Sequence, residues 1–429
     1  MKIKQIPQDF IVEEISTVEL LPNNQEGAYA IYRLTKVGID TFAAKKIIAN
    51  RLNLNYNYIG IAGLKDRHAH TIQYISIQNI KVNKDNNHRG NLVSLPASFS
   101  ERNIKIERIG YSNKPIKLGD IAKNKFTIVV RDIKKGAIDS ILMKINQVRR
   151  TGVPNYFDAQ RFGSIRNADE FIAKMLVRND YEAALKIFLS TVTRFNPMRI
   201  KKIRRFISMN WGKWNECISC IKENSPNIKG EIKIFQHLIM NNNDYRGAFN
   251  LINKDLIILY CAAYQSFLWN ECLKYILRKY IDEKNLLSVE YPAGRLLFFK
   301  SLDDNLYNKL NSISIPILAH NLEFKDNEID QEIKQAYTKV LEKQGLTFDD
   351  VKNNQKVFFK VSYRKTIVNV HEMRIESIEN DELNTKRVME RHHRQPEKKF
   401  KIRLSFMLGK GSYATLILKR IFPYDLEYR

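Results

Sequence analysis

The segment from Gly60 to Thr71 (GIAGLKDRHAHT) is the best candidate for chemistry, because it places a carboxylate among several basic side chains. Asp66 lies between Lys65 and Arg67. Neighbouring cations favour the ionised form of a carboxylate, and an ionised carboxylate is a candidate nucleophile. A charged turn exposed to solvent would have the same composition, so this segment alone does not decide between chemistry and a surface loop.

Two imidazoles in the same segment suggest a different chemistry. His68 and His70 are two residues apart, and side chains at that spacing on a strand point to the same side. Together with Asp66 they could bind a metal ion in a metal-dependent nuclease. The sequence has no H-E-x-x-H motif and no carboxylate cluster to complete such a site. We therefore expect no bound metal.

A second segment, residues 153–163 (VPNYFDAQRFG), combines aromatic rings with amide and guanidinium groups. These side chains are Tyr156, Phe157, Phe162, Asn155, Gln160 and Arg161. Aromatic rings can stack on a base that has left its helix, while amides and guanidinium groups contact base edges or phosphates. A helix-capping turn with buried aromatic side chains would share this composition, so the segment by itself is only a candidate RNA-binding element.

Strands and helices must position these two segments. Apolar alternation or β-branched enrichment predicts strands at residues 28–34, 71–77, 104–110 and 125–131. Helical spacing predicts helices at residues 41–53 and 136–150. The Asp66 segment lies between strand-like stretches, so we expect it to form a loop at a sheet edge or a hairpin tip.

The rest of the chain first shows helical spacing of its apolar residues and then returns to strand-like patterns. Helical spacing predicts helices at residues 167–176, 181–190, 197–207, 229–240 and 256–280. Strands are predicted again at residues 355–363 and 401–408, and a helix at 411–420 with Ser412 as its N-cap. The pattern therefore predicts an α+β unit that is interrupted by a largely helical insertion.

The charge of the chain favours a polyanionic partner. The 429 residues include 71 Lys and Arg against 46 Asp and Glu, a net charge of +25. Neutralising phosphates with such cations releases counterions and favours binding. A compositional bias toward Lys would also raise the charge, but it would not explain the Arg-rich stretches 199–205 (RIKKIRR) and 387–394 (RVMERHHR). We expect a nucleic acid as partner.

The number of cysteines and the hydropathy of the chain indicate the cellular compartment. Four cysteines and no signal peptide fit a reducing cytoplasm, and no apolar run approaches the length of a membrane span. Cys217 and Cys220 form a lone C-x-x-C pair, which lacks the further ligands of a structural zinc site. We expect all four cysteines to be packing residues in a cytoplasmic protein without membrane association.

Taken together, the two segments resemble the signature motifs of the TruD family of RNA pseudouridine synthases. Residues 62–71 are similar to its G-x-K-D-x-x-A-x-T-type motif, and residues 155–163 to its N-Y-F-x-x-Q-R-F-G motif. Four further similarities are Lys4 with residues 7–14 (PQDFIVEE), and residues 36–41 (KVGIDT), 118–126 (LGDIAKNKF) and 411–415 (GSYAT). Six similarities in the same order are far more specific than either segment alone.

The resemblance implies an enzyme that isomerises uridine to pseudouridine in RNA, typically at position 13 of tRNA, without a metal or an organic cofactor. Asp66 would be the nucleophile, and Phe157 would stack on the target uracil. Asn155 would position the aspartate or the base, and Lys4 would be the cation paired with the aspartate. The other substrate-binding residues would be Lys65, Arg67, Gln160 and Arg161.

The resemblance also implies a fold. We expect an α+β protein whose mixed, mainly antiparallel sheet forms a pseudouridine synthase core at residues 1–170 and 356–429. A helix-rich α+β insertion domain would occupy residues 171–355. We expect a monomer with no obligate protein partner. The alternative is a non-catalytic RNA-binding protein, for which charge and aromatic side chains would suffice without Asp66.

Overall fold

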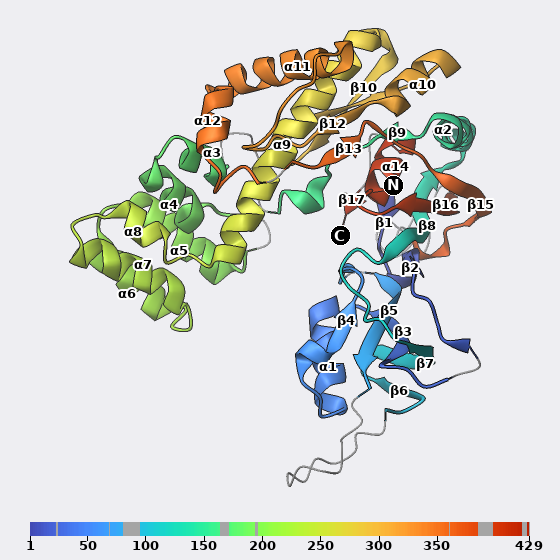
Figure 1. The fold of residues 1–429 in the computed structure, drawn as a ribbon, viewed down its shortest axis with the longest axis horizontal. Helices are drawn as coiled ribbons and strands as arrows, with labels where there is room; N and C mark the ends of the chain where they lie inside the picture. The colour runs from blue at the N-terminus through green and yellow to red at the C-terminus, as the bar shows by residue number, and fades with distance from the viewer. Residues whose placement is uncertain are drawn as a thin grey trace. The chain divides into compact units, whose positions relative to one another are not determined.

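The computed structural model describes residues 1–22, 25–67, 69–79, 95–163, 171–193, 196–359, 361–384, 398–422 and 427–428. The chain forms two compact units (Figure 1): unit 1 comprises Met1–Val153 and Val368–Arg429, and unit 2 comprises Pro154–Ile367. The chain passes from one unit to the other in the short strands β9 (Val153–Pro154) and β14 (Ile367–Val368). Residues 154–163 therefore belong to unit 2, whereas we expected them to belong to the sheet core.

Unit 1 is built on a mixed sheet with 11 strands among the described residues, and its main path runs β15-β16-β8-β2-β5-β3-β7-β6. The strands of this path are β2 (Phe10–Ser16), β3 (Tyr29–Val37), β5 (His70–Gln78), β6 (Ser98–Glu101), β7 (Ile104–Ser112), β8 (Ile121–Lys134), β15 (His371–Asn380) and β16 (Lys399–Gly409). The strands β1 (Lys2–Ile3), β4 (Ile59–Ile61) and β17 (Glu427–Tyr428) pair at its margins. Most pairs are antiparallel, as expected for the core.

One parallel pair determines where the N-terminal segment lies. β2 pairs in parallel with β5, so that Val12 is opposite Thr71. The beginning of β2 is thereby brought next to the loop that leads into β5. That loop contains Asp66, and the residues just before β2 include Lys4.

The α-helices of unit 1 within the described residues are α1 (Thr41–Arg51), α2 (Ile138–Thr151) and α14 (Ala414–Ile421). The apolar side of α1 covers β3 and β5, where Ala44 and Ile48 bury their side chains with Tyr32, Leu34 and Ile75. α14 packs against α2 (Figure 1). The helical spacing predicted at 41–53 and 136–150 therefore corresponds to α1 and α2.

Unit 2 is organised around α9 (Lys254–Tyr280), a helix of 27 residues. In the described part of unit 2, six shorter α-helices precede it: α3 (Ile172–Val177), α4 (Tyr181–Ser190), α5 (Met198–Met209), α6 (Trp214–Asn224), α7 (Lys229–Met240) and α8 (Tyr245–Phe249). Neighbours in this series pack against one another, and within unit 2 they gather toward one end of α9 (Figure 1). The helices predicted at 181–190, 197–207, 229–240 and 256–280 are confirmed as α4, α5, α7 and α9.

The part of unit 2 that follows α9 mixes helices and strands. The elements are β10 (Leu286–Tyr291), β11 (Gly294–Phe299), α10 (Asp304–Ser312), β12 (Ser314–Pro316), α11 (Glu328–Gln344), α12 (Phe348–Asn353) and β13 (Tyr363–Lys365). β10 and β11 form a hairpin, β12 pairs with β13, and α11 packs along α9. Unit 2 is thus an α+β unit rich in helices, as the resemblance implies.

Two local predictions are wrong. Residues 355–358 form a turn and a bend instead of a strand, because the amides of Val357 and Phe358 both donate to the carbonyl oxygen of Asn354. The helix predicted at 411–420 begins at Ala414, with Tyr413 and not Ser412 at its N-cap. Three predictions fall outside the described residues: His68, residues 167–170 of a predicted helix, and the basic stretch 387–394.

The cysteines and the hydropathy of the helices add two observations. All four cysteines are buried and none forms a disulfide. Among the helices that the structure describes, none has the length and apolar character needed to cross a membrane.

Candidate active site

Asp66 lies in the loop that joins β4 to β5, two strands that pair as an antiparallel hairpin. Its side chain is 39% exposed, so the carboxylate is accessible to solvent. The Nζ of Lys4 lies 3.3 Å from Oδ2 of Asp66, and the lysine side chain is only 12% exposed. The structure therefore places an accessible carboxylate beside a mostly buried cation, 62 residues away in the sequence.

The ammonium of Lys4 is fixed from a second side by an aromatic ring. It lies 4.2 Å from the centroid of the Phe10 ring, within the range of a cation–π interaction. Lys4 also has a φ of 57°, in the left-handed region, which costs a residue with a side chain about 1–2 kcal/mol. Strain of this kind persists where the surrounding structure imposes it, and it concentrates at functional sites.

A buried ion cluster anchors the segment that carries Lys4. Nη2 of Arg131 on β8 lies 2.8 Å from Oδ1 of Asp9, and Nη1 lies 3.1 Å from Oδ1 of Asp381. All three side chains are at most 9% exposed, so the pairs are shielded from solvent. Asp9 directly precedes β2, and this cluster therefore fixes the chain a few residues after Lys4.

Lys65 does not extend into solvent beside Asp66. Its Nζ lies 2.7 Å from Oε2 of Glu14 on β2, and the two side chains are 7% and 0% exposed. Burial raises the pKa of Glu14, whereas the charge and the hydrogen bond of Lys65 lower it. This position favours a role for Lys65 in holding the loop against β2 over direct contact with RNA.

The main chain of the same loop has further buried partners. The amide of Lys65 donates to Oγ1 of Thr41 (3.0 Å), and the Thr41 hydroxyl donates to Oε1 of Gln73 (3.2 Å). Lys36 donates to the carbonyl oxygens of Lys65 and Asp66. No site role was assigned to Lys36, Thr41 or Glu14 from the sequence, although each belongs to a stretch that resembles a family motif, and that membership was the available signal.

The remaining residues of the first segment are only partly described. Arg67 is exposed, and His70 is partly buried at the start of β5. His68 lies outside the described residues. Within the described ranges, no three His, Cys, Asp or Glu side chains are grouped so that they could hold a metal ion.

The second candidate segment lies in unit 2 and presents Phe157 in a cationic and aromatic setting. The Phe157 side chain is 4% exposed. The guanidinium carbon of Arg364 lies 4.4 Å from the ring centroid, and that of Arg161 lies 5.3 Å from it. Trp269 meets the ring edge-on at 5.6 Å. The ring is thus held by two cation–π contacts and one edge-to-face aromatic contact.

Asn270 on α9 holds the main chain of Phe157 at both of its polar atoms. The amide of Phe157 donates to Oδ1 of Asn270 (2.8 Å), and Nδ2 of Asn270 donates to the carbonyl oxygen of Phe157 (2.9 Å). Both residues are buried, so neither bond competes with water. The clamp joins positions 113 residues apart.

Asn155 is held by two residues of the strand β13. Nη2 of Arg364 donates to Oδ1 of Asn155 (2.6 Å), and Nε of Arg364 donates to its carbonyl oxygen (2.6 Å). Nδ2 of Asn155 donates to the carbonyl oxygen of Lys365 (3.0 Å). Arg364 was not identified from the sequence, because it lies in a segment with no recognisable motif.

Gln160 and Arg161 are exposed on the short 3-10 helix Ala159–Arg161. Together with Asn155 and Phe157 they form one group of predicted residues in unit 2. Lys4, Lys65, Asp66 and Arg67 form the other group, in unit 1. The structure therefore brings the predicted residues together as two groups, each inside its own unit.

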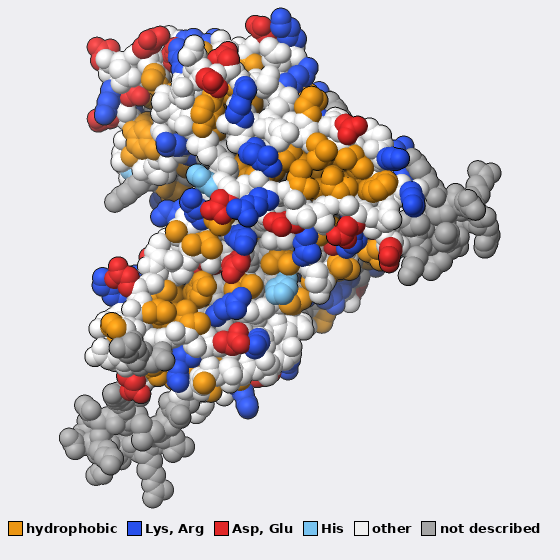
Figure 2. Space-filling model, turned by 90° about the vertical axis from the view of Figure 1, so that its right-hand side faces the viewer, with side chains coloured by type: hydrophobic (Ala, Val, Ile, Leu, Met, Phe, Trp, Pro, Cys, Tyr) orange, Lys and Arg blue, Asp and Glu red, His pale blue; other side chains and the backbone are white. Residues whose placement is uncertain are grey.

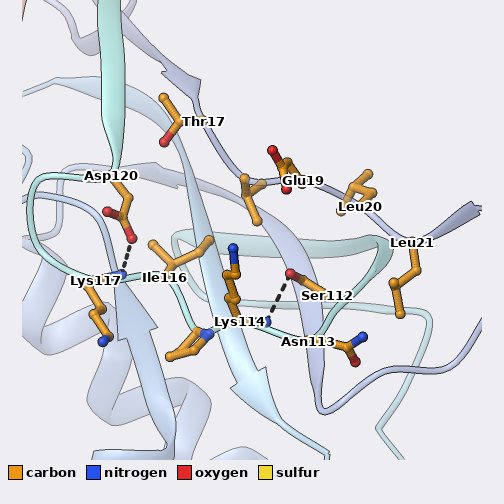
Figure 3. A pocket seen from close by; sticks show the side chains of 12 residues that line it. Thr17, Glu19, Leu20, Leu21, Ser112, Asn113, Lys114, Ile116, Lys117 and Asp120 are labelled. Atoms are coloured by element: carbon orange, nitrogen blue, oxygen red, sulfur yellow. Dashed lines mark hydrogen bonds between the residues drawn. The ribbon is translucent and has the colours of Figure 1, made fainter.

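Unit 1 also has a groove of about 580 Å³ that none of the predicted site residues lines (Figure 3). Its walls are formed by residues 17–21 on one side and by residues 112–117 with Asp120 on the other. Charges of both signs occur there, Glu19 and Asp120 against Lys114 and Lys117. On the face of the molecule drawn in Figure 2, Lys and Arg side chains are likewise interspersed with acidic and hydrophobic ones.

Comparison with protein families gives a match over nearly the whole chain. The model of the family described as "tRNA pseudouridine synthase D (TruD)" matches residues 1–421. This range includes both candidate segments and all six stretches that resemble family motifs.

Individual proteins agree with the family match. The chain is 38% identical to "Probable tRNA pseudouridine synthase D 2" of Methanocaldococcus jannaschii, over 98% of this chain and 92% of that protein. It is 28% identical to "tRNA pseudouridine synthase D" of Aquifex aeolicus, over 100% of this chain and 99% of that protein. A crystal structure assigned to TruD from Methanosarcina mazei superimposes with a TM-score of 0.70 at 25% identity, covering 99% of this chain and 93% of that one.

Proposed function

The chain belongs to the tRNA pseudouridine synthase D (TruD) family, and from this premise we propose that it isomerises uridine to pseudouridine in tRNA, at position 13, with Asp66 as the nucleophile. The observation that carries the proposal is the accessible carboxylate of Asp66, paired with the mostly buried ammonium of Lys4 at 3.3 Å. The enzyme is an isomerase, and its substrate is RNA. We place it in the cytoplasm and expect it to work as a monomer.

In the proposed reaction, the bond between uracil N1 and the sugar carbon C1′ breaks, and a bond between uracil C5 and C1′ forms. The proton of C5 is lost and N1 gains one, so the reaction needs no co-reactant. Asp66 either takes up the electrophilic sugar carbon or removes a proton from the sugar. Lys4 orients the carboxylate and supplies a fixed charge beside it, without reorganisation of water.

The target uracil must leave the RNA stack for this chemistry. We propose that it stacks on Phe157, with Asn155 as a positioning residue. Support comes from the rigid setting of the segment: Asn270 holds the main chain of Phe157, and Arg364 holds that of Asn155. Gln160 and Arg161, which are exposed, would contact the RNA.

We further propose that the two units have different roles in the reaction. Unit 1 would be the catalytic domain, and unit 2 would combine the TruD-type insertion with the uracil-stacking segment. The basis is the position of Asp66 and Phe157 in units 1 and 2, respectively.

The test is release of tritium from tRNA that carries tritium at uridine C5, with wild type and Asp66→Asn compared in the presence of a chelator. We expect release by the wild type and none by the variant. Equal tRNA binding without release by either protein would support the non-catalytic RNA-binding alternative. Cleavage of the RNA that occurs without chelator and stops when chelator is added would instead indicate the metal-dependent nuclease.

A further inference from the structure

We propose that Lys36 is a positioning residue for the nucleophile: its buried ammonium holds the main chain of the Asp66 loop in the conformation that presents the carboxylate. The inference rests on the proposed function and assigns a role to a side chain that has no access to the substrate. Lys36 lies on β3 and is 0% exposed.

The ammonium of Lys36 is surrounded by main-chain acceptors. Its Nζ donates to the carbonyl oxygens of Ile39 (2.8 Å), Asp66 (3.0 Å) and Lys65 (3.2 Å). An ammonium group has three donors, so these three carbonyls use its full capacity. One side chain thus joins the turn after β3 to the loop that carries the nucleophile.

The turn after β3 is shaped to deliver one of these acceptors. Gly38 has a φ of 69°, in the left-handed region that glycine adopts without cost, and the next residue, Ile39, directs its carbonyl oxygen back to Lys36. Thr41, at the start of α1, accepts from the amide of Lys65. The stretch 36–41 therefore contacts the loop through both an ammonium and a hydroxyl group.

Burying the charged ammonium of Lys36 costs free energy, which argues against a role that is limited to filling space in the core. Burial lowers its pKa to about 8, although the negative charges of Asp66 and Asp40 raise it; the positive charge of Lys65 lowers it further. An apolar side chain of similar length would fill the space without a desolvation cost. What only the ammonium supplies is a set of donors for the loop carbonyls.

The two states of Lys36 differ in the number of donors. A neutral amine has two N–H donors, one fewer than the ammonium, so deprotonation would leave one of the three carbonyls without its bond. The loop should loosen as the pH rises through about 8, the pKa of Lys36. This behaviour can be observed in the wild type, without any substitution.

The experiment compares wild type with Lys36→Met and with Arg108→Met as the control. Arg108 on β7 of the same sheet also donates to a main-chain carbonyl, that of Leu95 (2.9 Å), but it does not touch the Asp66 loop. We expect Lys36→Met to lower the single-turnover rate of tritium release about 10- to 100-fold, as small displacements of a reacting group do, with tRNA Kd within about twofold of wild type. Arg108→Met should retain the wild-type rate.

Two further measurements separate positioning from general stability. The wild-type rate should fall as the pH rises through about 8, and this alkaline limb should be absent from Lys36→Met. Protection against hydrogen–deuterium exchange, measured relative to the intrinsic exchange rate at each pH, should fall in the peptide spanning residues 62–67 of the variant, and in the wild type above that pH. If Lys36→Met does not fold, the pH dependence of hydrogen–deuterium exchange in the wild type tests whether Lys36 holds the loop.

The outcomes distinguish this inference from the proposed function. Wild-type protein that releases no tritium from any tRNA refutes the function, and loop exchange then tests the contact of Lys36 alone. Active wild type with an unchanged rate and unchanged loop exchange in Lys36→Met overturns the inference. A rate loss that matches the fraction of unfolded variant, with the alkaline limb retained, overturns it as well.

Discussion

At the scale of single residues, the proposed chemistry depends on how Lys4 is held. Its ammonium lies between the carboxylate of Asp66 and the ring of Phe10, and its backbone adopts a left-handed conformation. The neighbouring ion cluster of Arg131 fixes the chain that follows. The charge beside Asp66 is therefore placed before substrate arrives, which is the condition for electrostatic catalysis.

Replacement of Lys4 by Met should affect the rate far more than stability. We expect the single-turnover rate to fall about 100-fold, because a fixed charge beside the nucleophile is lost. The free energy of unfolding should change by less than about 1 kcal/mol, because a partly exposed ion pair contributes little. Lys2→Met is the matched control, since Lys2 pairs with Asp132 (3.6 Å) and not with Asp66. A wild-type rate in Lys4→Met would remove Lys4 from the mechanism.

The clamp of Asn270 on Phe157 can be tested in the same way. Asn270→Ala leaves a buried N–H and a buried C=O without their partner, so we expect a loss of about 2–3 kcal/mol in unfolding free energy and slower catalysis. Ser266→Ala on the same helix removes only a bond to the helix's own Ala262 carbonyl and should be nearly neutral. Urea denaturation and tritium release measure both effects; equal behaviour of the two variants would contradict the proposed role.

At the scale of secondary-structure elements, the loop between β4 and β5 is positioned by its neighbours. β2 contributes Glu14, β3 contributes Lys36, α1 contributes Thr41 and β5 contributes Gln73, which donates to the carbonyl oxygen of Gly63. Each of these contacts comes from an element that the sheet order or the packing of α1 places beside the loop. The loop therefore owes its conformation to the sheet and not to its own short sequence.

The buried pair of Lys65 and Glu14 predicts a strong dependence of stability on both partners. Glu14→Leu leaves a buried ammonium without its carboxylate, and we expect a loss of about 3–5 kcal/mol in unfolding free energy. The double variant Glu14→Leu/Lys65→Met should recover most of this loss, because no buried charge remains. A double-mutant cycle by urea denaturation measures the coupling, and purely additive losses would show that the pair does not act as a unit.

The same pair predicts a pH effect of defined sign. Burial raises the pKa of Glu14 above its ordinary value of 4.5, despite the opposing effect of Lys65. The folded state then keeps the proton to higher pH than the unfolded chain does. The contribution of this pKa difference to the free energy of unfolding is complete below pH 4.5. It is lost as the pH rises through the pKa that Glu14 has in the folded state. The stability difference between wild type and Glu14→Gln should decline over this range; a constant difference would contradict the prediction.

Element predictions succeeded where one face of an element is buried. The alternation at 71–77 and 401–408 corresponds to β5 and β16, and the helical spacing at 181–190 to α4. The strand predicted at 355–363 failed at its start, because the amides of Val357 and Phe358 close a turn on the carbonyl oxygen of Asn354. Apolar composition indicates burial, but without strict alternation it does not indicate the backbone conformation.

At the scale of the whole molecule, the net charge of +25 suits an RNA substrate. Helix α5 contains no acidic residue, and Arg199, Lys202 and Arg205 on it are exposed. By contrast, the exposed side chains of Lys284 and Arg295 already have acidic partners, Asp282 and Glu290. Cations without acidic neighbours on their own helix are the better candidates for phosphate contacts.

Substitution of the α5 cations should weaken tRNA binding without altering the chemical step. For the triple variant Arg199→Ala/Lys202→Ala/Arg205→Ala we expect a higher Kd for tRNA. A plot of the logarithm of the association constant against the logarithm of the salt concentration should have a slope whose magnitude is smaller by about 0.7–0.9 for each lost phosphate contact. The rate at saturating tRNA should be unchanged. Lys284→Ala/Arg295→Ala is the control, and an equal change of slope in both proteins would argue against a contact through α5.

The sequence by itself determined the family, the expected nucleophile Asp66 and most of the regular elements, because motifs and apolar periodicity are local properties of the chain. Only the tertiary structure decided what surrounds them: Lys65 is buried against Glu14, 51 residues away, and Arg364 holds Asn155 from 209 residues away. Such contacts depend on which strands become neighbours. A cation beside an aspartate in the sequence can therefore point into the core, while a distant Lys4 becomes its ion-pair partner.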